Sequence, residues 1–296
     1  MSAAEREKLI GLLRERERPD PLTPAAMRAR MEELGEKFPA PADALIEPVE
    51  AGERPAEWVA APGSNPDRQV LYLHGGGYVQ GSLDTHRLLT YHLSHFSDAK
   101  VLALDYRLAP EHVCPAAIDD AISAYKWMLS QGGHASKIAI AGDSAGGGLA
   151  VSTLVAIRDA GLPMPAAGLC ISPWTDLAGT GASMETRRDA DPMLDAKILD
   201  WFATLYLGGA DANDPMASPL HADLSGLPPL LVQVGGDEIL LDDATRLVAR
   251  AEAAGVEANL KVWDGMMHVW HLFSPLLSEG LDGLAEAGEF IRARAS

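Results

Sequence analysis

The chain has 296 residues, and its 47% hydrophobic and 22% charged residues are typical of a globular protein with a sizeable core, which excludes disorder. A net charge of −18 opposes binding to nucleic acid or to an anionic membrane surface. The N-terminal segment mixes acids and bases without an apolar signal-peptide stretch, and no segment has the length and apolarity of a membrane span. Cys114 and Cys170 are too few for a disulfide framework. These features predict a cytoplasmic protein without membrane insertion or nucleic-acid partners.

Amphipathic helices are expected at the N-terminus up to about Phe38, because apolar residues recur there at roughly helical spacing among charges and prolines. Short β-rich runs begin at Ala44. The runs after residue 68 are almost continuously apolar, which is typical of strands buried on both faces. The predicted strands cover residues 44–50, 56–61, 69–74, 100–106, 137–142, 166–172, 229–235 and 258–263.

Helical segments, such as 116–131, 145–160 and 242–254, alternate with these strands. The alternation predicts an α/β fold with a mostly parallel central sheet and helices on both faces. A long interval between Ser172 and Pro229 interrupts it and contains a helix-forming stretch. We expect this insertion to form a lid with the N-terminal helices over the strand ends, where open α/β sheets bind ligands.

The sequence Gly142-Asp143-Ser144-Ala145-Gly146 matches the pattern G-x-S-x-G and lies between a predicted strand and a predicted helix. A sharp strand-to-helix turn needs glycines because the backbone packs too closely for Cβ atoms, and it exposes the serine as a nucleophile. A glycine-rich turn or phosphate loop is the alternative, but the GK[ST] residues of a phosphate loop are missing. The string also resembles the serine motif of chymotrypsin-like proteases, whose β-barrels do not have alternating helices.

The sequence His74-Gly75-Gly76-Gly77 follows directly on another predicted strand. Three glycines let the backbone approach a reacting carbonyl and present N–H donors to it. Gly76 and Gly77, together with the N–H of Ala145, therefore form the predicted oxyanion hole. Alone, this sequence could equally be a flexible turn, but a nucleophile motif further along the chain favours the catalytic interpretation.

A serine nucleophile needs a base. Of the nine histidines, His268 is the preferred candidate because it follows the last predicted strand through a short turn, where an α/β-hydrolase places its base. Most of the other histidines lie on a predicted helix or in polar loops, and His271 lies three residues after His268. His268 and His271 could share a metal, but no acidic or thiol ligand has matching spacing, so no metal site is predicted.

The acid that orients the base should follow the strand predicted at 229–235, where Asp237 and Glu238 are adjacent. Neighbouring side chains in an extended turn point apart, so at most one of them faces the histidine. The residue pattern alone does not choose between them.

Taken together, five stretches resemble the bacterial hormone-sensitive-lipase-like (family IV) carboxylesterases: HGGGY (74–78), DYRLAPEH (105–112), GDSAGGGLA (142–150), SPWTDL (172–177) and GMMH (265–268). The stretches GSLDTHR (81–87), ADPML (190–194) and HVWHLF (268–273) are similar to the branch that includes monoterpene ε-lactone hydrolases. The resemblance implies an α/β-hydrolase fold with N-terminal cap helices in residues 1–40. It places the catalytic domain at 41–296, with a cap insertion at about 178–210.

The resemblance also favours one acid. The family commonly reads D-P-L-x-D-[DE], and residues 238–243 fit this register with Glu238 in the acid's place. A register that starts at Asp237 loses both Leu240 and Asp242. Triads of this fold accept either acid, so Glu238 is the predicted partner of His268. The implied mechanism is ester hydrolysis by Ser144 through an acyl-enzyme, and it needs no metal or organic cofactor.

Small ester substrates with short- to medium-chain acyl groups are expected, because the lid is short and carries bulky side chains. Tyr78, Trp174, Phe202 and Leu205 are the predicted substrate-binding residues, and packing between lid and core is the equal alternative for them. The same groups could cleave a lactone, amide or peptide bond. A non-catalytic small-ligand-binding module is a further alternative, against which the presence of His268 argues. We also allow for a homodimer.

Overall fold

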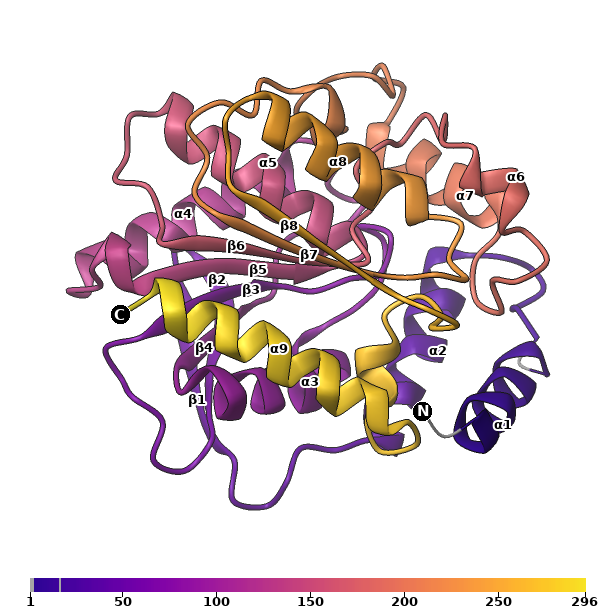
Figure 1. Ribbon diagram of the computed structural model, residues 1–296, viewed down its shortest axis with the longest axis horizontal. Coiled ribbons are helices and arrows are strands. Elements are labelled where there is room, and N and C mark those ends of the chain that lie inside the picture. The colour runs from indigo at the N-terminus through magenta and orange to yellow at the C-terminus, as the bar shows by residue number, and fades with distance from the viewer. Residues whose placement is uncertain (1–2, 16) are drawn as a thin grey trace.

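The computed structural model describes residues 3–15 and 17–296, which form an eight-stranded sheet with the order β1-β2-β4-β3-β5-β6-β7-β8 and helices on both faces (Figure 1). The pairs β1–β2 and β2–β4 are antiparallel, and the strands from β4 to β8 run parallel to one another. The predicted α/β fold with a mostly parallel sheet is therefore confirmed. The strands are β1 (Leu45–Ala51), β2 (Arg54–Ala60), β3 (Gln69–Leu73), β4 (Lys100–Leu104), β5 (Ile138–Asp143), β6 (Ala167–Ile171), β7 (Leu230–Gly235) and β8 (Ala258–Trp263).

The central strands consist mostly of small and branched apolar residues because helices cover both of their faces. Every residue of β5, β6 and β7 is buried. Strand β8 differs from the expectation of a strand buried on both faces, since it is the edge of the sheet and several of its residues are exposed. Cys170 is buried in β6, whereas Cys114 is only half-buried in a loop.

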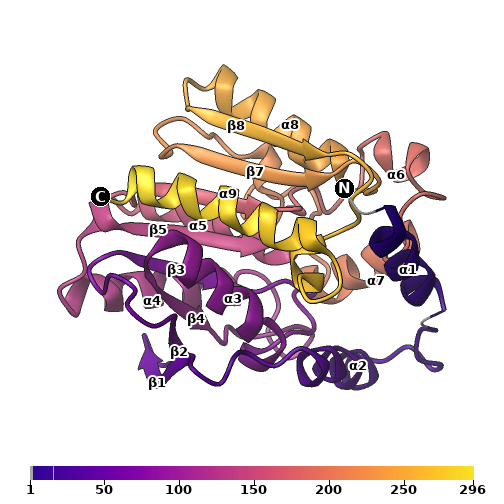
Figure 2. The same ribbon diagram turned by 60° about the horizontal axis from the view of Figure 1, so that its bottom comes forward.

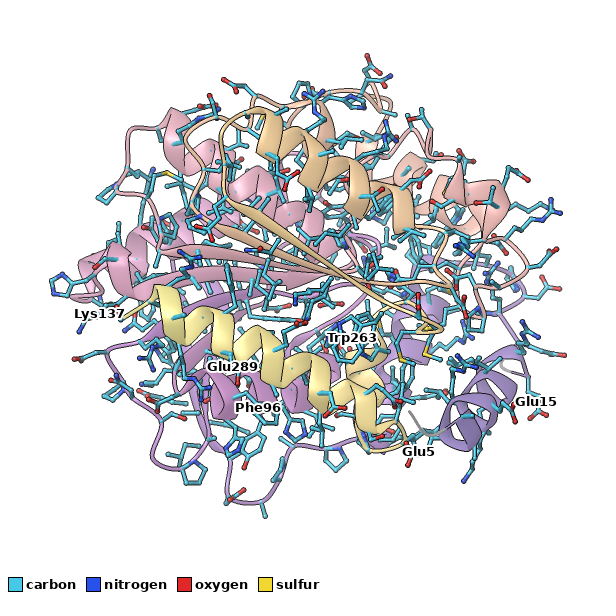
Figure 3. All side chains as sticks on the ribbon, viewed as in Figure 1. Glu5, Glu15, Phe96, Lys137, Trp263 and Glu289 are labelled. Atoms are coloured by element: carbon cyan, nitrogen blue, oxygen red, sulfur yellow. The ribbon has the colours of Figure 1, made fainter. Side chains whose placement is uncertain are left out.

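Two helices cover one face of the sheet and three cover the other, among the residues that the structure describes (Figure 1). One layer comprises α3 (Leu83–Ser97) and α9 (Ser278–Arg294), and the opposite layer comprises α4 (Ala116–Ser130), α5 (Ala145–Asp159) and α8 (Leu241–Ala253). Helices α3 and α9 are so close that a Cβ atom on Gly288 of α9 would lie 2.3 Å from the carbonyl carbon of Phe96 of α3, which Figure 3 labels beside α9.

The remaining helices lie beyond the carboxyl ends of the parallel strands (Figure 2). They are α1 (Ala3–Arg14), α2 (Pro24–Lys37), α6 (Ser183–Thr186) and α7 (Ala196–Leu207). Short 3-10 helices occur at η1 (Ala135–Lys137), η2 (Pro219–His221) and η3 (Trp270–Phe273). Within residues 3–15 and 17–296, none of the helices is long and apolar enough to cross a membrane.

The N-terminal segment and the insertion, predicted to form a lid together, are in contact. Arg18 pairs with Asp195 at 2.6 Å, and the guanidinium of Arg14 donates to the carbonyl oxygen of Asp189 at 3.1 Å. Asp195 also accepts the N–H of Ile198 at 2.9 Å and so caps α7. Residues 1, 2 and 16 of the predicted N-terminal cap lie outside the described residues.

Candidate active site

Ser144 lies at the tip of a sharp turn between β5 and α5. Its φ of 55° and ψ of −123° are unusual for a residue with a side chain, and such strain persists only where neighbours enforce it. Two neighbours do so: the Ser144 N–H donates to Ile171 at 2.8 Å, and its carbonyl accepts the N–H of Trp174 at 2.9 Å. The turn therefore presents the Ser144 hydroxyl at the carboxyl edge of the sheet.

Glycine is required beside Ser144 because the turn packs against β3. A Cβ atom on Gly146 would lie 2.0 Å from the carbonyl oxygen of Leu73. Real Cβ atoms do not approach so closely, so the motif needs glycine here for the reason that the sequence pattern indicated.

His268 lies in the loop after β8 and joins two of the predicted residues. Its Nε2 lies 2.8 Å from the Oγ of Ser144, and its Nδ1 lies 2.8 Å from the Oε2 of Glu238. His268 and Glu238 are both buried, whereas Asp237 is half-buried and its backbone N–H donates to Met266. Of the two adjacent carboxylates, the structure therefore brings Glu238 to the histidine.

The second oxygen of Glu238 is also held. Its Oε1 accepts the hydroxyl of Ser172 and the N–H of Gly235, each at 2.6 Å. Ser172 in turn accepts the N–H of Val269 at 3.1 Å, which ties the loop of His268 to the end of β6. Sequence reasoning did not assign a role to Ser172. The only signal was its place at the start of SPWTDL, one of the stretches that carry the resemblance.

The electrostatics of the site favour a charged His268. Burial by itself would lower the pKa of His268, but the charge and hydrogen bond of Glu238, together with the charges of Asp191 and Asp143, raise the pKa above 6.5. An imidazolium that forms during proton transfer from Ser144 is therefore stabilised in this position.

The predicted oxyanion donors lie on two neighbouring segments. Gly76 and Gly77 follow β3 and have φ values of 121° and 62°, which favour glycine. Ala145 begins α5, whose first N–H groups have no partner within the helix. Strands β3 and β5 are directly paired, with Leu73 opposite Gly142, so both segments leave the sheet at the same place.

A buried carboxylate anchors the glycine loop. The Oδ1 of Asp143 accepts the N–H of Gly75 at 2.9 Å and the hydroxyl of Tyr72 at 2.6 Å. The hydroxyl of Tyr106 donates to the carbonyl of His74 at 2.7 Å. Burial and the charge of His86 lower the pKa of His74 to about 4, against the opposing effects of its hydrogen bond to Gly75 and of the Asp143 charge, so its ring is neutral at pH 7. The residue that precedes Ser144 therefore fixes the loop of the predicted oxyanion hole.

A pocket of about 530 Å³ lies between the N-terminal segment and the insertion. Phe202, one of the predicted substrate-binding residues, forms part of its wall, and the ring of Phe202 is so close to Gly77 that a Cβ atom on Gly77 would lie 2.5 Å from it. The pocket therefore adjoins the glycine loop. The two segments supply most of its lining, which comprises Leu13, Arg14, Arg18, Met27, Arg30, Met31, Leu34, Arg188, Asp191, Pro192, Met193, Leu194, Asp195, Ile198 and Phe202, joined by Gln80, Leu272 and Phe273.

The other predicted substrate-binding residues do not line this pocket. Tyr78 is buried and stacks on Tyr206 with ring centroids 3.8 Å apart, and its ring lies 6.2 Å from that of Trp174, which is also buried. Leu205 is half-buried and packs against the main core. For Tyr78, Trp174 and Leu205 the structure therefore places the side chain in packing between lid and core, the alternative that the sequence left open.

The histidine three residues after His268 has different partners. The Nε2 of His271 lies 3.0 Å from the Oε1 of Gln233, and burial lowers the pKa of His271 to about 3. His268 and His271 thus bind separate side chains. Among the described residues, no three His, Cys, Asp or Glu side chains are grouped so that they could hold a metal ion.

Residues 70–272 match a family described as having the alpha/beta hydrolase fold, and the chain belongs to this family. It is also similar to a solved structure of an esterase from the bacterial hormone-sensitive lipase family, with 48% identity, complete coverage of both chains and a TM-score of 0.97. The resemblance to the hormone-sensitive-lipase-like esterases is thereby confirmed.

Two similar proteins are named as hydrolases of this kind. The chain is 49% identical to an acetyl-hydrolase of Streptomyces hygroscopicus over 82% of this chain and 81% of the relative. It is 36% identical to an esterase of Acinetobacter venetianus over 91% of this chain and 89% of the relative. The protein is a carboxylic ester hydrolase.

Proposed function

We propose that the protein is a serine carboxylesterase with Ser144 as nucleophile, His268 as base and Glu238 as the acid that orients it. The observation that carries this proposal is the continuous chain of contacts from Ser144 through His268 to Glu238, each 2.8 Å long, at a strained strand-to-helix turn. A hydroxyl next to a neutral imidazole is an activated nucleophile when a carboxylate fixes the ring.

Hydrolysis proceeds in two steps. The Oγ of Ser144 attacks the ester carbonyl while His268 takes its proton, and the N–H groups of Gly76, Gly77 and Ala145 bind the resulting oxyanion. His268 gives the proton to the departing alcohol, which leaves an acyl-enzyme. Water then attacks this ester with His268 again as base, and the carboxylic acid and free Ser144 are released.

The proposed substrates are small esters with short- to medium-chain acyl groups. Support comes from the pocket of about 530 Å³, which lies in the lower half of the usual range of ligand sites and has the Phe202 ring against the glycine loop. The segments that surround it, residues 1–40 and about 178–210, act in this proposal as a cap on a catalytic domain at 41–296. A series of p-nitrophenyl esters from acetate to palmitate tests activity and acyl length together, and faster hydrolysis of palmitate than of butyrate would contradict this part.

A lactone is the second candidate substrate, because the same groups carry out every acyl transfer and the stretch ADPML is similar to the branch with lactone hydrolases. Parallel assays of an ester, a lactone and an anilide separate these activities. Absence of activity on all three would instead favour a non-catalytic ligand-binding module.

A cytoplasmic location and a homodimer complete the proposal. Both cysteines are free thiols, as expected in a reducing compartment. Strand β8 ends the sheet with an unpaired edge that a second copy could extend. Cell fractionation tests the location, and light scattering of the purified protein tests the dimer.

A further inference from the structure

Asp191 is a buried carboxylate in the stretch ADPML of the insertion. The proposed mechanism assigns no step to this carboxylate. Only 8% of it is exposed. Its Oδ1 accepts the N–H groups of Met193 and Leu194, both at 2.9 Å, which closes a tight turn within the insertion. A carboxylate needs only one oxygen for such a turn, so the other oxygen is free to bind elsewhere.

That second oxygen reaches the loop of the proposed acid. The Oδ2 of Asp191 accepts the N–H of Ile239, the residue after Glu238, at 3.0 Å. The carbonyl of Ile239 in turn accepts the hydroxyl of Ser183 at 2.6 Å. The insertion therefore binds both the N–H and the carbonyl of Ile239. These are long-range contacts, because the two segments lie about fifty residues apart in sequence.

Asp191 also acts on His268 through its charge. The negative charges that raise the pKa of His268 come from three different elements: Glu238 after β7, Asp191 in the insertion and Asp143 at the end of β5. Burial raises the pKa of Asp191 itself, and the charge of His268 opposes that rise. The same pocket wall carries four arginines and one further carboxylate: Arg14, Arg18, Arg30, Arg188 and Asp195.

Packing strengthens the connection between the insertion and the base. Met193, which follows Asp191 in the same turn, packs against a buried cluster that contains Met266 and Met267, the two residues before His268. The turn closed by Asp191 therefore binds the loop of the acid on one side and packs on the other against the cluster to which the loop of the base belongs.

We propose that Asp191 is a positioning residue: it holds the loop that carries Glu238 and places a second buried carboxylate near His268, so that the insertion helps to align and charge-stabilise the acid–base pair. This inference rests on the proposed roles of Ser144 and His268. It assigns to the insertion a part in the chemistry in addition to forming a pocket wall.

The test compares variants that weaken the contacts of the insertion with Ile239, with and without loss of the negative charge of Asp191. Asp191→Asn removes the charge and keeps an acceptor for the turn, whereas Ser183→Ala loosens the same loop and leaves the charge in place. The pH dependence of kcat/KM is measured with p-nitrophenyl acetate at the isosbestic wavelength of nitrophenol. Stability is followed by thermal unfolding.

We expect the midpoint of the rising limb to fall by about half to one pH unit in Asp191→Asn, because an opposite charge near the imidazole is lost. We expect kcat to fall about tenfold with little change in KM, as for a group that acts mainly in the transition state. Ser183→Ala should reduce stability and kcat while its midpoint stays at the wild-type value. Asp191→Glu, which keeps the charge, should also retain that midpoint.

An unmoved midpoint in Asp191→Asn, or an equal shift in Ser183→Ala, would overturn the inference and leave Asp191 a purely structural residue. If Asp191→Asn does not fold, Asp191→Ser is a second uncharged variant that retains an oxygen for the turn. Full activity of Ser144→Ala would instead contradict the proposed function, so the two failures are distinguishable.

Discussion

Glu238 uses one carboxylate oxygen for His268 and the other for its own anchoring. Its Oε2 lies 2.8 Å from the Nδ1 of His268, while its Oε1 is held at 2.6 Å by both Ser172 and Gly235. Any rotation of the carboxylate breaks several of these contacts. The acid is therefore oriented before a substrate arrives, which avoids the cost of reorganisation during the reaction.

Replacement of this acid should disable the base. In Glu238→Gln the amide oxygen can keep the bonds from Ser172 and Gly235, so its NH2 group faces His268 and favours the tautomer that cannot accept the serine proton. We expect kcat to fall by orders of magnitude, up to about 10⁴-fold. Asp237→Asn is the matched control and should cost about tenfold at most, a loss on the scale of one local hydrogen bond.

The double variant of Glu238→Gln and Asp237→Asn shows whether Asp237 substitutes for its neighbour, since substitution produces non-additive losses. A severe loss confined to Asp237→Asn would reverse the assignment of the acid.

Removal of the nucleophile should abolish turnover without unfolding the protein. Ser144→Ala deletes the hydroxyl that forms the acyl-enzyme, and we expect kcat/KM to fall by about 10⁴-fold or more. The backbone bonds of Ser144 to Ile171 and Trp174 do not involve the hydroxyl, so the melting temperature should change little. A variant that keeps a tenth of the wild-type kcat/KM would exclude the serine mechanism.

Activity should rise with pH through the titration of His268. Only the neutral ring accepts a proton, and the pKa of His268 is raised above 6.5 by Glu238, Asp191 and Asp143 against the effect of burial. The midpoint of kcat/KM in the free enzyme is therefore expected above about 6.5, the value of an unperturbed histidine. A profile that is flat from about pH 5 to 9 with chemistry rate-limiting would count against His268 as base.

Acyl-chain preference should respond to Phe202 and not to a neighbour on the same helix. Phe202→Ala opens the pocket wall beside Gly77, and we expect the ratio of octanoate to acetate hydrolysis to rise severalfold. Leu205→Ala alters the same helix away from the pocket and should leave the ratio unchanged. The ratio is the measurement because both variants can lose stability through lost packing. Equal ratios in both variants would exclude Phe202 as a determinant of acyl length.

Asp243 should make stability fall as pH rises. Burial, opposed by the N–H groups of Thr175 and Asp176 and assisted by the Asp176 charge, raises the pKa of Asp243 from 3.8 to about 7. The folded protein therefore holds a proton that the unfolded chain releases. This contribution to the free energy of unfolding is complete below pH 3.8 and is lost as pH rises through about 7, with a slope of up to about 1.4 kcal/mol per pH unit.

Asp243→Asn keeps an oxygen that accepts the N–H groups of Thr175 and Asp176 and removes the titration. We expect its melting temperature to decline less than that of the wild type between about pH 5 and 8. An unchanged pH dependence would show that Asp243 does not titrate in this range.

Much of the fold could be predicted from the sequence because its signals are local. The apolar run of β5 and the glycines beside Ser144 each reflect contacts within a few residues or with an adjacent strand. The position of His268 followed from chain order within a familiar fold. Leu240 and Asp242 identified the register of the acid loop, but only through the family resemblance, since two adjacent carboxylates have no local feature that separates them.

Residues that act at long range could not be found in this way. Ser172 binds Glu238 across 66 positions of sequence, and its hydroxyl is chemically like that of any other serine. The bulky residues predicted to bind substrate were ambiguous for the same reason, because an aromatic ring such as that of Tyr78 fits a core and a pocket equally well. Both rings belong to the main core, and of the two only that of Phe202 also lines the pocket.

The pocket wall is built almost entirely by segments that contain neither Ser144, His268 nor Glu238. Changes in residues 3–37 or 183–207 can therefore alter which esters are accepted without disturbing the sheet that aligns the reacting groups. Substitutions that arise under selection for a new substrate should accordingly lie mostly in these two segments. In directed evolution of specificity, these segments are the first to randomise, with Asp191 kept unchanged.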